Sequence, residues 1–94
     1  METKDVQGNG VYELYSEAIK LEKSNRTDEA IEMYEKLVQD NSIFISLYMR
    51  LGALYEMKRL KEKAIEIYRK GIWKSSAMKN KKAESYLSHM LLGL

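Results

Sequence analysis

The chain has 94 residues, 45% of them hydrophobic, with 16 Lys and Arg against 14 Asp and Glu and no cysteine. This length suits one domain with a modest core, and the lack of cysteine excludes disulfides, thiolate metal sites and cysteine nucleophiles. Because no apolar run approaches the ~20 residues of a membrane span and the N-terminus is too polar for a signal peptide, we expect a cytoplasmic protein that does not enter a membrane.

The first half of the chain predicts a tail followed by two helices. Residues 1–10 end in Gly8-Asn9-Gly10 without helical periodicity, which predicts a flexible N-terminal tail. Leu14, Ala18 and Leu21 recur at helical spacing and predict a helix over about 11–23. A turn follows at 24–26, and Thr27 is the expected N-cap of a second helix.

The second half predicts three further helices. Residues 43–57 are apolar on nearly every side, which is typical of a buried helix. A fourth helix contains Ala64 and Tyr68 and is followed by a loop over 74–79. Ala83, Leu87 and Met90 then predict an amphipathic helix over about 80–92.

Two stretches of the chain match each other at a constant offset. Ala30-Ile31-Glu32 recurs as Ala64-Ile65-Glu66, and Tyr34 recurs as Tyr68. The offset is 34 residues. A period of this length indicates a helical repeat array, in which each unit buries its apolar face against a neighbour.

The residues that carry this period resemble the tetratricopeptide repeat family, which places small, bulky and aromatic residues at fixed positions of each repeat unit. The matching positions are Leu14, Ala18, Leu21, Ala30, Tyr34 and Leu37 in one unit and Tyr48, Gly52, Tyr55, Ala64, Tyr68 and Gly71 in the next. Leu37 departs from a usually small position, and Ser42 stands where proline is frequent.

The resemblance implies an all-α fold of five helices, a right-handed stack of antiparallel helix pairs. Its parts would be repeat one over 11–44, repeat two over 45–78 and a capping helix over about 80–92, all within a single domain of residues 11–94. The capping helix is expected because repeat arrays need a terminal element to cover the last apolar face.

The resemblance also implies a concave groove that receives a peptide or helix. The groove positions that match the family are Tyr12, Tyr15, Ile19, Glu22 and Lys23 in repeat one, and Ser46, Met49, Ala53, Glu56 and Met57 in repeat two. One branch of the family clamps the C-terminal carboxylates of chaperones with asparagines. Ile19 and Arg50 occupy those asparagine positions here, so capture of chaperone tails is not expected and Arg50 joins the candidate groove residues.

Catalysis, a metal site and a cofactor are not expected. His89 is the single histidine, and Ser85 lies one helical turn before it. A nucleophilic serine also needs an orienting third group and an oxyanion site, for which the sequence offers no pattern. A solvent-exposed or interface histidine is the simpler interpretation.

Charge is unevenly distributed along the chain. Residues 1–57 hold 6 Lys and Arg against 11 Asp and Glu, whereas residues 58–82 hold 10 Lys and Arg against 2 Asp and Glu.

The sequence leads to three hypotheses about function. The first is an adaptor that binds a protein or peptide partner in the groove, and the second is a self-associating subunit that forms a homo-oligomer through the groove or its charged ends. The third and weakest is a nucleic-acid accessory that uses Lys74, Lys79, Lys81 and Lys82.

Overall fold

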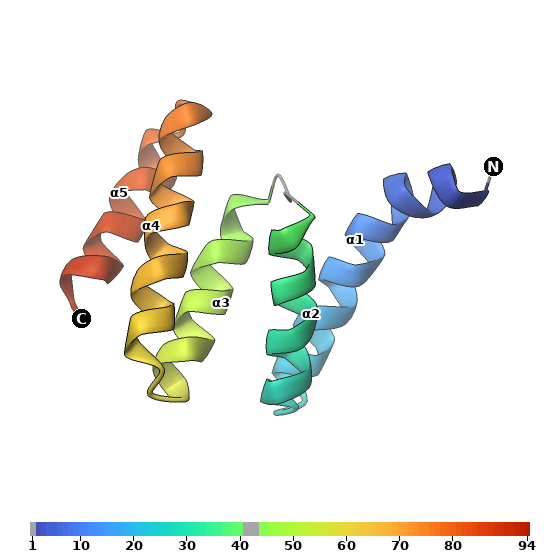
Figure 1. Cartoon of the computed structure of the whole chain (residues 1–94), viewed down its shortest axis with the longest axis horizontal. Coiled ribbons are helices and arrows are strands. Elements are labelled where there is room, and N and C mark those ends of the chain that lie inside the picture. Colours follow the sequence, from blue (N-terminus) through green and yellow to red (C-terminus); the bar gives the residue numbers. More distant parts are fainter. Residues whose placement is uncertain (1, 41–43) are drawn as a thin grey trace. The chain divides into compact units, whose positions relative to one another are not determined.

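The computed structural model describes residues 2–40 and 44–94, and these residues form five helices (Figure 1). They are α1 (Glu2–Lys23), α2 (Thr27–Gln39), α3 (Ile45–Met57), α4 (Lys61–Ala77) and α5 (Lys81–Leu92). The all-α helical repeat expected from the sequence is confirmed. Among the described residues, none of the helices combines the length and the apolar character needed to cross a membrane.

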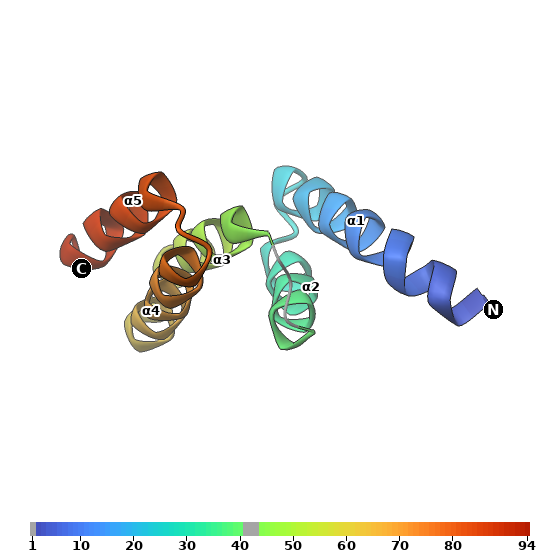
Figure 2. The same ribbon diagram turned by 90° about the horizontal axis from the view of Figure 1, so that it is seen from above.

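The chain divides into two compact units, residues 1–42 and residues 43–94. In the first unit, α1 and α2 pack against each other as an antiparallel pair. In the second unit, α4 packs against both α3 and α5, and α5 also touches α3 (Figures 1 and 2). Each unit therefore has its own packed interface between helices that follow one another in sequence.

Most of the positions that define the repeat lie in the core. All of them are buried except Leu14, of which 36% is exposed. Leu37, the departure from the family pattern, is fully buried despite its size. The position equivalent to Leu37 in the second unit is Gly71, and there Tyr48, the equivalent of Leu14, is buried. Tyr48 lies where α3, α4 and α5 meet around Gly71, whereas the first unit is built from α1 and α2.

Gly71 allows three helices to approach closely. A methyl group at this position would lie 2.8 Å from Cβ of Tyr48 on α3 and 2.9 Å from Cδ1 of Leu87 on α5. Ser75, one turn later on α4, is buried and donates a hydrogen bond of 2.7 Å to the Gly71 carbonyl. A polar side chain is thereby accommodated in the core without loss of a hydrogen bond.

Three helices end in the same way. In the turn after each of α1, α3 and α4, one residue has a left-handed backbone conformation. The amide of the next residue donates a hydrogen bond to the carbonyl five residues earlier, and this bond satisfies a carbonyl at the end of the helix. The residues with positive φ are Asn25 (64°), Arg59 (62°) and Lys79 (58°). The closing bonds run from Arg26 to Leu21 at 2.9 Å, from Leu60 to Tyr55 at 2.8 Å and from Asn80 to Ser75 at 2.8 Å.

Several boundaries differ from those expected. Helix α1 begins at Glu2 and not at Val11, so residues 2–10 are helical where the sequence predicts a flexible tail. The stretch contains no proline, and Gly8 and Gly10 disfavour a helix by only about 1 kcal/mol each, so the helix can extend through them. Ile43, the expected first residue of the third helix, lies outside the described residues.

The prediction that Thr27 caps α2 is wrong. Arg26 is the N-cap and Thr27 is the first helical residue. The turn after α1 is short, because the amide of Arg26 already bonds to the Leu21 carbonyl at the end of α1 and α2 begins at the next residue.

Helix α4 continues to Ala77, which reduces the expected loop over 74–79 to residues 78–80. The start of α5 agrees with the prediction, since the Asn80 side chain accepts a hydrogen bond of 3.1 Å from the Ala83 amide.

Candidate functional site

The first unit holds five candidate residues on one face of α1. Tyr12, Tyr15, Ile19, Glu22 and Lys23 follow one another at spacings of one, three or four residues, which gathers them along a single stripe of a helix. Tyr12 is 64% exposed and Lys23 is exposed, whereas the other three are half-buried. We call these five residues the α1 strip.

The second unit holds the remaining four on α3, and we call them the α3 strip: Met49, Arg50, Ala53 and Met57. Met49, Ala53 and Met57 are spaced by four residues and therefore share one face. Met57 is 66% exposed and Ala53 is exposed, while Met49 and Arg50 are half-buried. Each strip thus combines apolar surface that remains accessible with side chains partly anchored in the core.

A buried tyrosine anchors one acidic residue in each unit. The hydroxyl of Tyr34 donates a hydrogen bond of 2.7 Å to Oε1 of Glu22, and the hydroxyl of Tyr68 donates one of 2.5 Å to Oε2 of Glu56. These two bonds join equivalent positions of the two repeats. Glu22 and Glu56 are therefore held against the core of their own unit.

Tyr15 belongs to the same cluster in the first unit. Its ring packs against that of Tyr34 at a centroid distance of 6.1 Å and an interplanar angle of 60°. Tilted aromatic pairs at this distance are favourable and fix ring orientation. The α1 strip is thus partly pre-organised through Tyr34, a core residue that is not among the predicted groove positions. The same separation between glutamate and tyrosine in both repeats is the signal that could have identified this pair.

Burial and the hydrogen bond to Glu56 raise the pKa of Tyr68 above its ordinary value. An unfolded tyrosine has a pKa near 10, so above about pH 10 the unfolded chain loses this proton before the folded chain does. We therefore expect the free energy of unfolding to decrease as the pH rises beyond about 10, by at most about 1.4 kcal/mol per pH unit from this group. Chemical denaturation at several alkaline pH values measures the slope.

Tyr68→Phe is the variant that isolates this contribution. It should be less stable than the wild type near neutral pH, by about 0.5–1.5 kcal/mol for the lost hydrogen bond, and its alkaline slope should be shallower. An alkaline slope equal to that of the wild type would show that another group is responsible.

The Ser–His pair and three basic residues of the third hypothesis lie on α5 or close to its start. Ser85 and His89 are both exposed on α5, as are Lys79, Lys81 and Lys82 around its N-terminus. Within the described part of the chain, no three His, Cys, Asp or Glu side chains gather closely enough to hold a metal ion.

Comparison with solved structures supports the repeat architecture. The solution structure of a tetratricopeptide repeat domain protein from Salinibacter ruber is 26% identical and superimposes with a TM-score of 0.82, over 88% of this chain and 84% of that one. A crystal structure of a tetratricopeptide repeat domain protein from Salinibacter ruber gives a TM-score of 0.80 at 26% identity, over 88% of this chain and 92% of that one.

The fold is that of a tetratricopeptide repeat. No family model matches the sequence, and no curated protein matches it significantly, so the structural likeness and the residues at the repeat positions carry this assignment together. Tetratricopeptide repeats stack helix pairs into extended surfaces that serve protein interaction in general.

Proposed function

We propose that this tetratricopeptide repeat chain is an adaptor that binds an apolar peptide or an amphipathic helix through the α1 strip and the α3 strip. The observation that carries the proposal is the accessible apolar and aromatic surface on equivalent faces of two equivalent helices. Tyr12 and Met57 alone leave about two thirds of their surface exposed. Tyrosine and methionine are well suited to such contacts, because one is amphipathic and the other adapts its shape.

The chemistry of the strips favours an apolar partner over a charged one. Six of the nine strip residues are uncharged. Glu22 already accepts a hydrogen bond from Tyr34, and Lys23 and Arg50 are the cations of the two strips. An amphipathic helix that places its apolar face in a groove matches this surface, with anchors at helical spacing.

Tyr15→Ala should weaken the binding of a peptide selected from a random display library by about 1–2 kcal/mol. Binding energy concentrates in a few large aromatic anchors, and Tyr15 is held in place by Tyr34 before the partner arrives. Isothermal titration of the selected peptide against wild type and variant measures the loss. Because the contact is apolar, raising the salt concentration should change the affinity little.

Two further variants separate binding from folding. Tyr12→Ala removes a side chain that is 64% exposed from the same strip and should weaken peptide binding, and the melting temperature of the variant is measured beside its affinity. Tyr86→Ala removes a half-exposed tyrosine from α5, outside both strips, and should leave the affinity unchanged. Equal affinities for all four proteins, together with strong salt sensitivity, would place the binding site on the charged surfaces.

A further inference from the structure

The single tryptophan of the chain lies on the surface of the second unit. Trp73 on α4 is 73% exposed. Arg69 and Lys70 precede it by four and three residues and are exposed as well, so the three side chains share one face of α4. One exposed aromatic residue is ordinary on a protein surface, but this one is flanked by two cations and has the size of a typical interface anchor.

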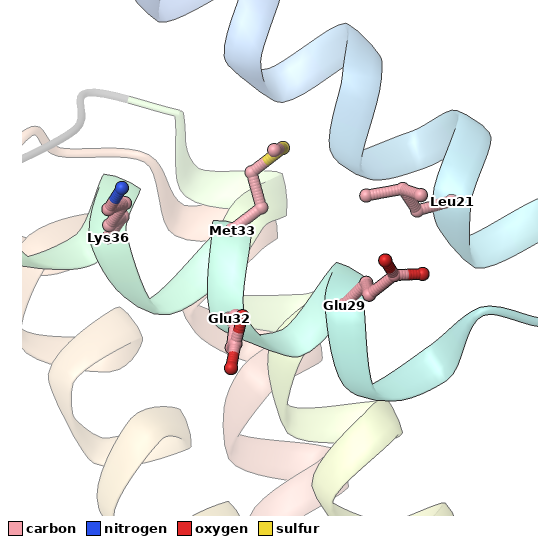
Figure 3. Close-up of a pocket in the computed structure, with 5 residues that line it drawn as sticks. All are labelled: Leu21, Glu29, Glu32, Met33 and Lys36. Atoms are coloured by element: carbon pink, nitrogen blue, oxygen red, sulfur yellow. The ribbon is translucent and has the colours of Figure 1, made fainter.

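The first unit contains a pocket of complementary character. It has a volume of about 320 Å³ and lies between α1 and α2. Figure 3 shows Leu21 reaching from α1 toward α2, while Met33 and Glu29 reach from α2 toward α1. Leu21 and Met33 supply apolar surface, Glu29 and Glu32 supply carboxylates, and Lys36 supplies an ammonium group. Glu29 is already paired with Arg26, whose Nη2 lies 2.9 Å from Oε2 of Glu29. This volume is at the lower end of the range for ligand pockets and is suited to one large side chain.

The equivalent place in the second unit has an aromatic residue and a cation of its own. The residues that match Leu21 and Glu29 in the second repeat are Tyr55 and Lys63, and Lys63 Nζ lies 5.6 Å from the centroid of the Tyr55 ring. In the first unit a leucine replaces the aromatic residue and a glutamate replaces the lysine. Glu29 already has a cationic partner in Arg26, so the aromatic side chain is the component that a residue from outside would add.

The charges of the two units also complement each other. Residues 1–42 hold 5 Lys and Arg against 10 Asp and Glu, whereas residues 43–94 hold 11 against 4. The first unit is therefore net negative and the second unit net positive. Opposite charges on two surfaces speed their encounter and favour one orientation.

We propose that Trp73 of one copy of this chain inserts into the α1–α2 pocket of a second copy. The indole lies against Leu21 and Met33, and sulfur–aromatic contact with Met33 adds to the apolar burial. Arg69 and Lys70 of the first copy face Glu32 of the second, since Glu29 is already paired with Arg26. The contact joins different surfaces of the two copies, so it forms a head-to-tail junction. It uses neither strip of the proposed partner site and stands independently of that proposal.

The intrinsic fluorescence of the chain tests this contact directly, because Trp73 is the sole tryptophan. As the concentration rises, the emission maximum should move to shorter wavelength over the same range in which sedimentation equilibrium shows the mass increasing. Met33→Lys should weaken the association about tenfold or more, as expected for a charge placed in an anchor pocket. Leu92→Ala, which truncates another exposed apolar residue of the second unit, should change neither measurement.

A charge exchange keeps the test independent of folding, because Glu32 and Lys70 are both exposed. Glu32→Lys and Lys70→Glu should each weaken self-association when studied alone, and an equimolar mixture of the two variants should restore it. The proposal would be overturned if the mass and the wavelength of the emission maximum both stay constant over the concentration series. This holds for an emission wavelength typical of an exposed indole and for one typical of a buried indole. So would association that is insensitive to Met33→Lys and to both charge reversals.

Discussion

Truncating Leu87 to alanine is expected to lower the free energy of unfolding by about 2–5 kcal/mol. Leu87 is fully buried on α5. Its Cδ1 atom would lie 2.9 Å from a methyl group added at Gly71 of α4. Since glycine has no side chain to move into the vacated space, the cavity should remain largely unfilled. Such a cavity adds to the lost transfer free energy of the removed methyl groups.

Leu92→Ala is the matched control, since it makes the same chemical change on the same helix at a residue that is 85% exposed. Its effect should stay within about 0.5 kcal/mol. Urea denaturation followed by far-ultraviolet circular dichroism compares the two variants with the wild type. Similar stabilities for both variants would mean that α5 does not pack on α4, and this would contradict the prediction that α5 caps the second unit.

Replacing Gly52 by leucine should destabilise the chain by about 3 kcal/mol or more, at the upper end of what overpacking costs. A Cβ atom at this position would lie 2.8 Å from Cδ1 of the Tyr68 ring and closer still to Cε1. The ring cannot easily move away, because Tyr68 is fully buried and its hydroxyl is hydrogen-bonded to Glu56.

The control is Ala53→Leu, one residue along the same helix, where the side chain is exposed. Leucine and alanine are both strong helix formers, so this substitution should be nearly neutral for stability. Thermal unfolding of the two variants separates overpacking from any general effect of leucine on α3. Equal melting temperatures would show that α3 and α4 approach each other less closely than the structure indicates.

The core could be predicted from the sequence because each core position occurs in both repeats, with similar residues at an equivalent place. Tyr34 and Tyr68, Ala30 and Ala64, and Ala18 and Gly52 were each identified by their counterpart in the other repeat, and all are buried. Leu14 is the exception. Its equivalent Tyr48 is buried where three helices meet, and the periodicity of one helix does not show which neighbouring helices cover a position.

The helix ends were less predictable than the helices. The spacing of Leu14, Ala18 and Leu21 says nothing about how far α1 extends toward the N-terminus, since propensity alone does not stop a helix at a glycine. At the other end of the same helix, the left-handed residue Asn25 allows a turn so short that Thr27 already belongs to α2.

The sequence predicted which residues occupy groove positions. It did not predict whether each of these side chains is exposed or hydrogen-bonded to the core. The resemblance placed Glu22 and Lys23 together in a groove, whereas the structure shows Glu22 hydrogen-bonded to Tyr34 and Lys23 exposed. Which groove positions are anchored to the core depends on side-chain geometry across two helices. The pocket beside Leu21 and Met33 depends in the same way on α1 and α2 together, and the periodic pattern of either helix alone does not show it.

Within each unit, the packing of helices that follow one another in sequence has a consequence for the speed of folding. Helix α1 meets α2 after a short turn, α4 follows α3 equally closely, and α5 returns onto α4 at once. Few distant segments must find each other, so little loop-closure entropy is spent before favourable contacts form. Helical proteins rich in local contacts fold in microseconds to milliseconds, and each unit of this chain can begin to form as soon as its own helices are available.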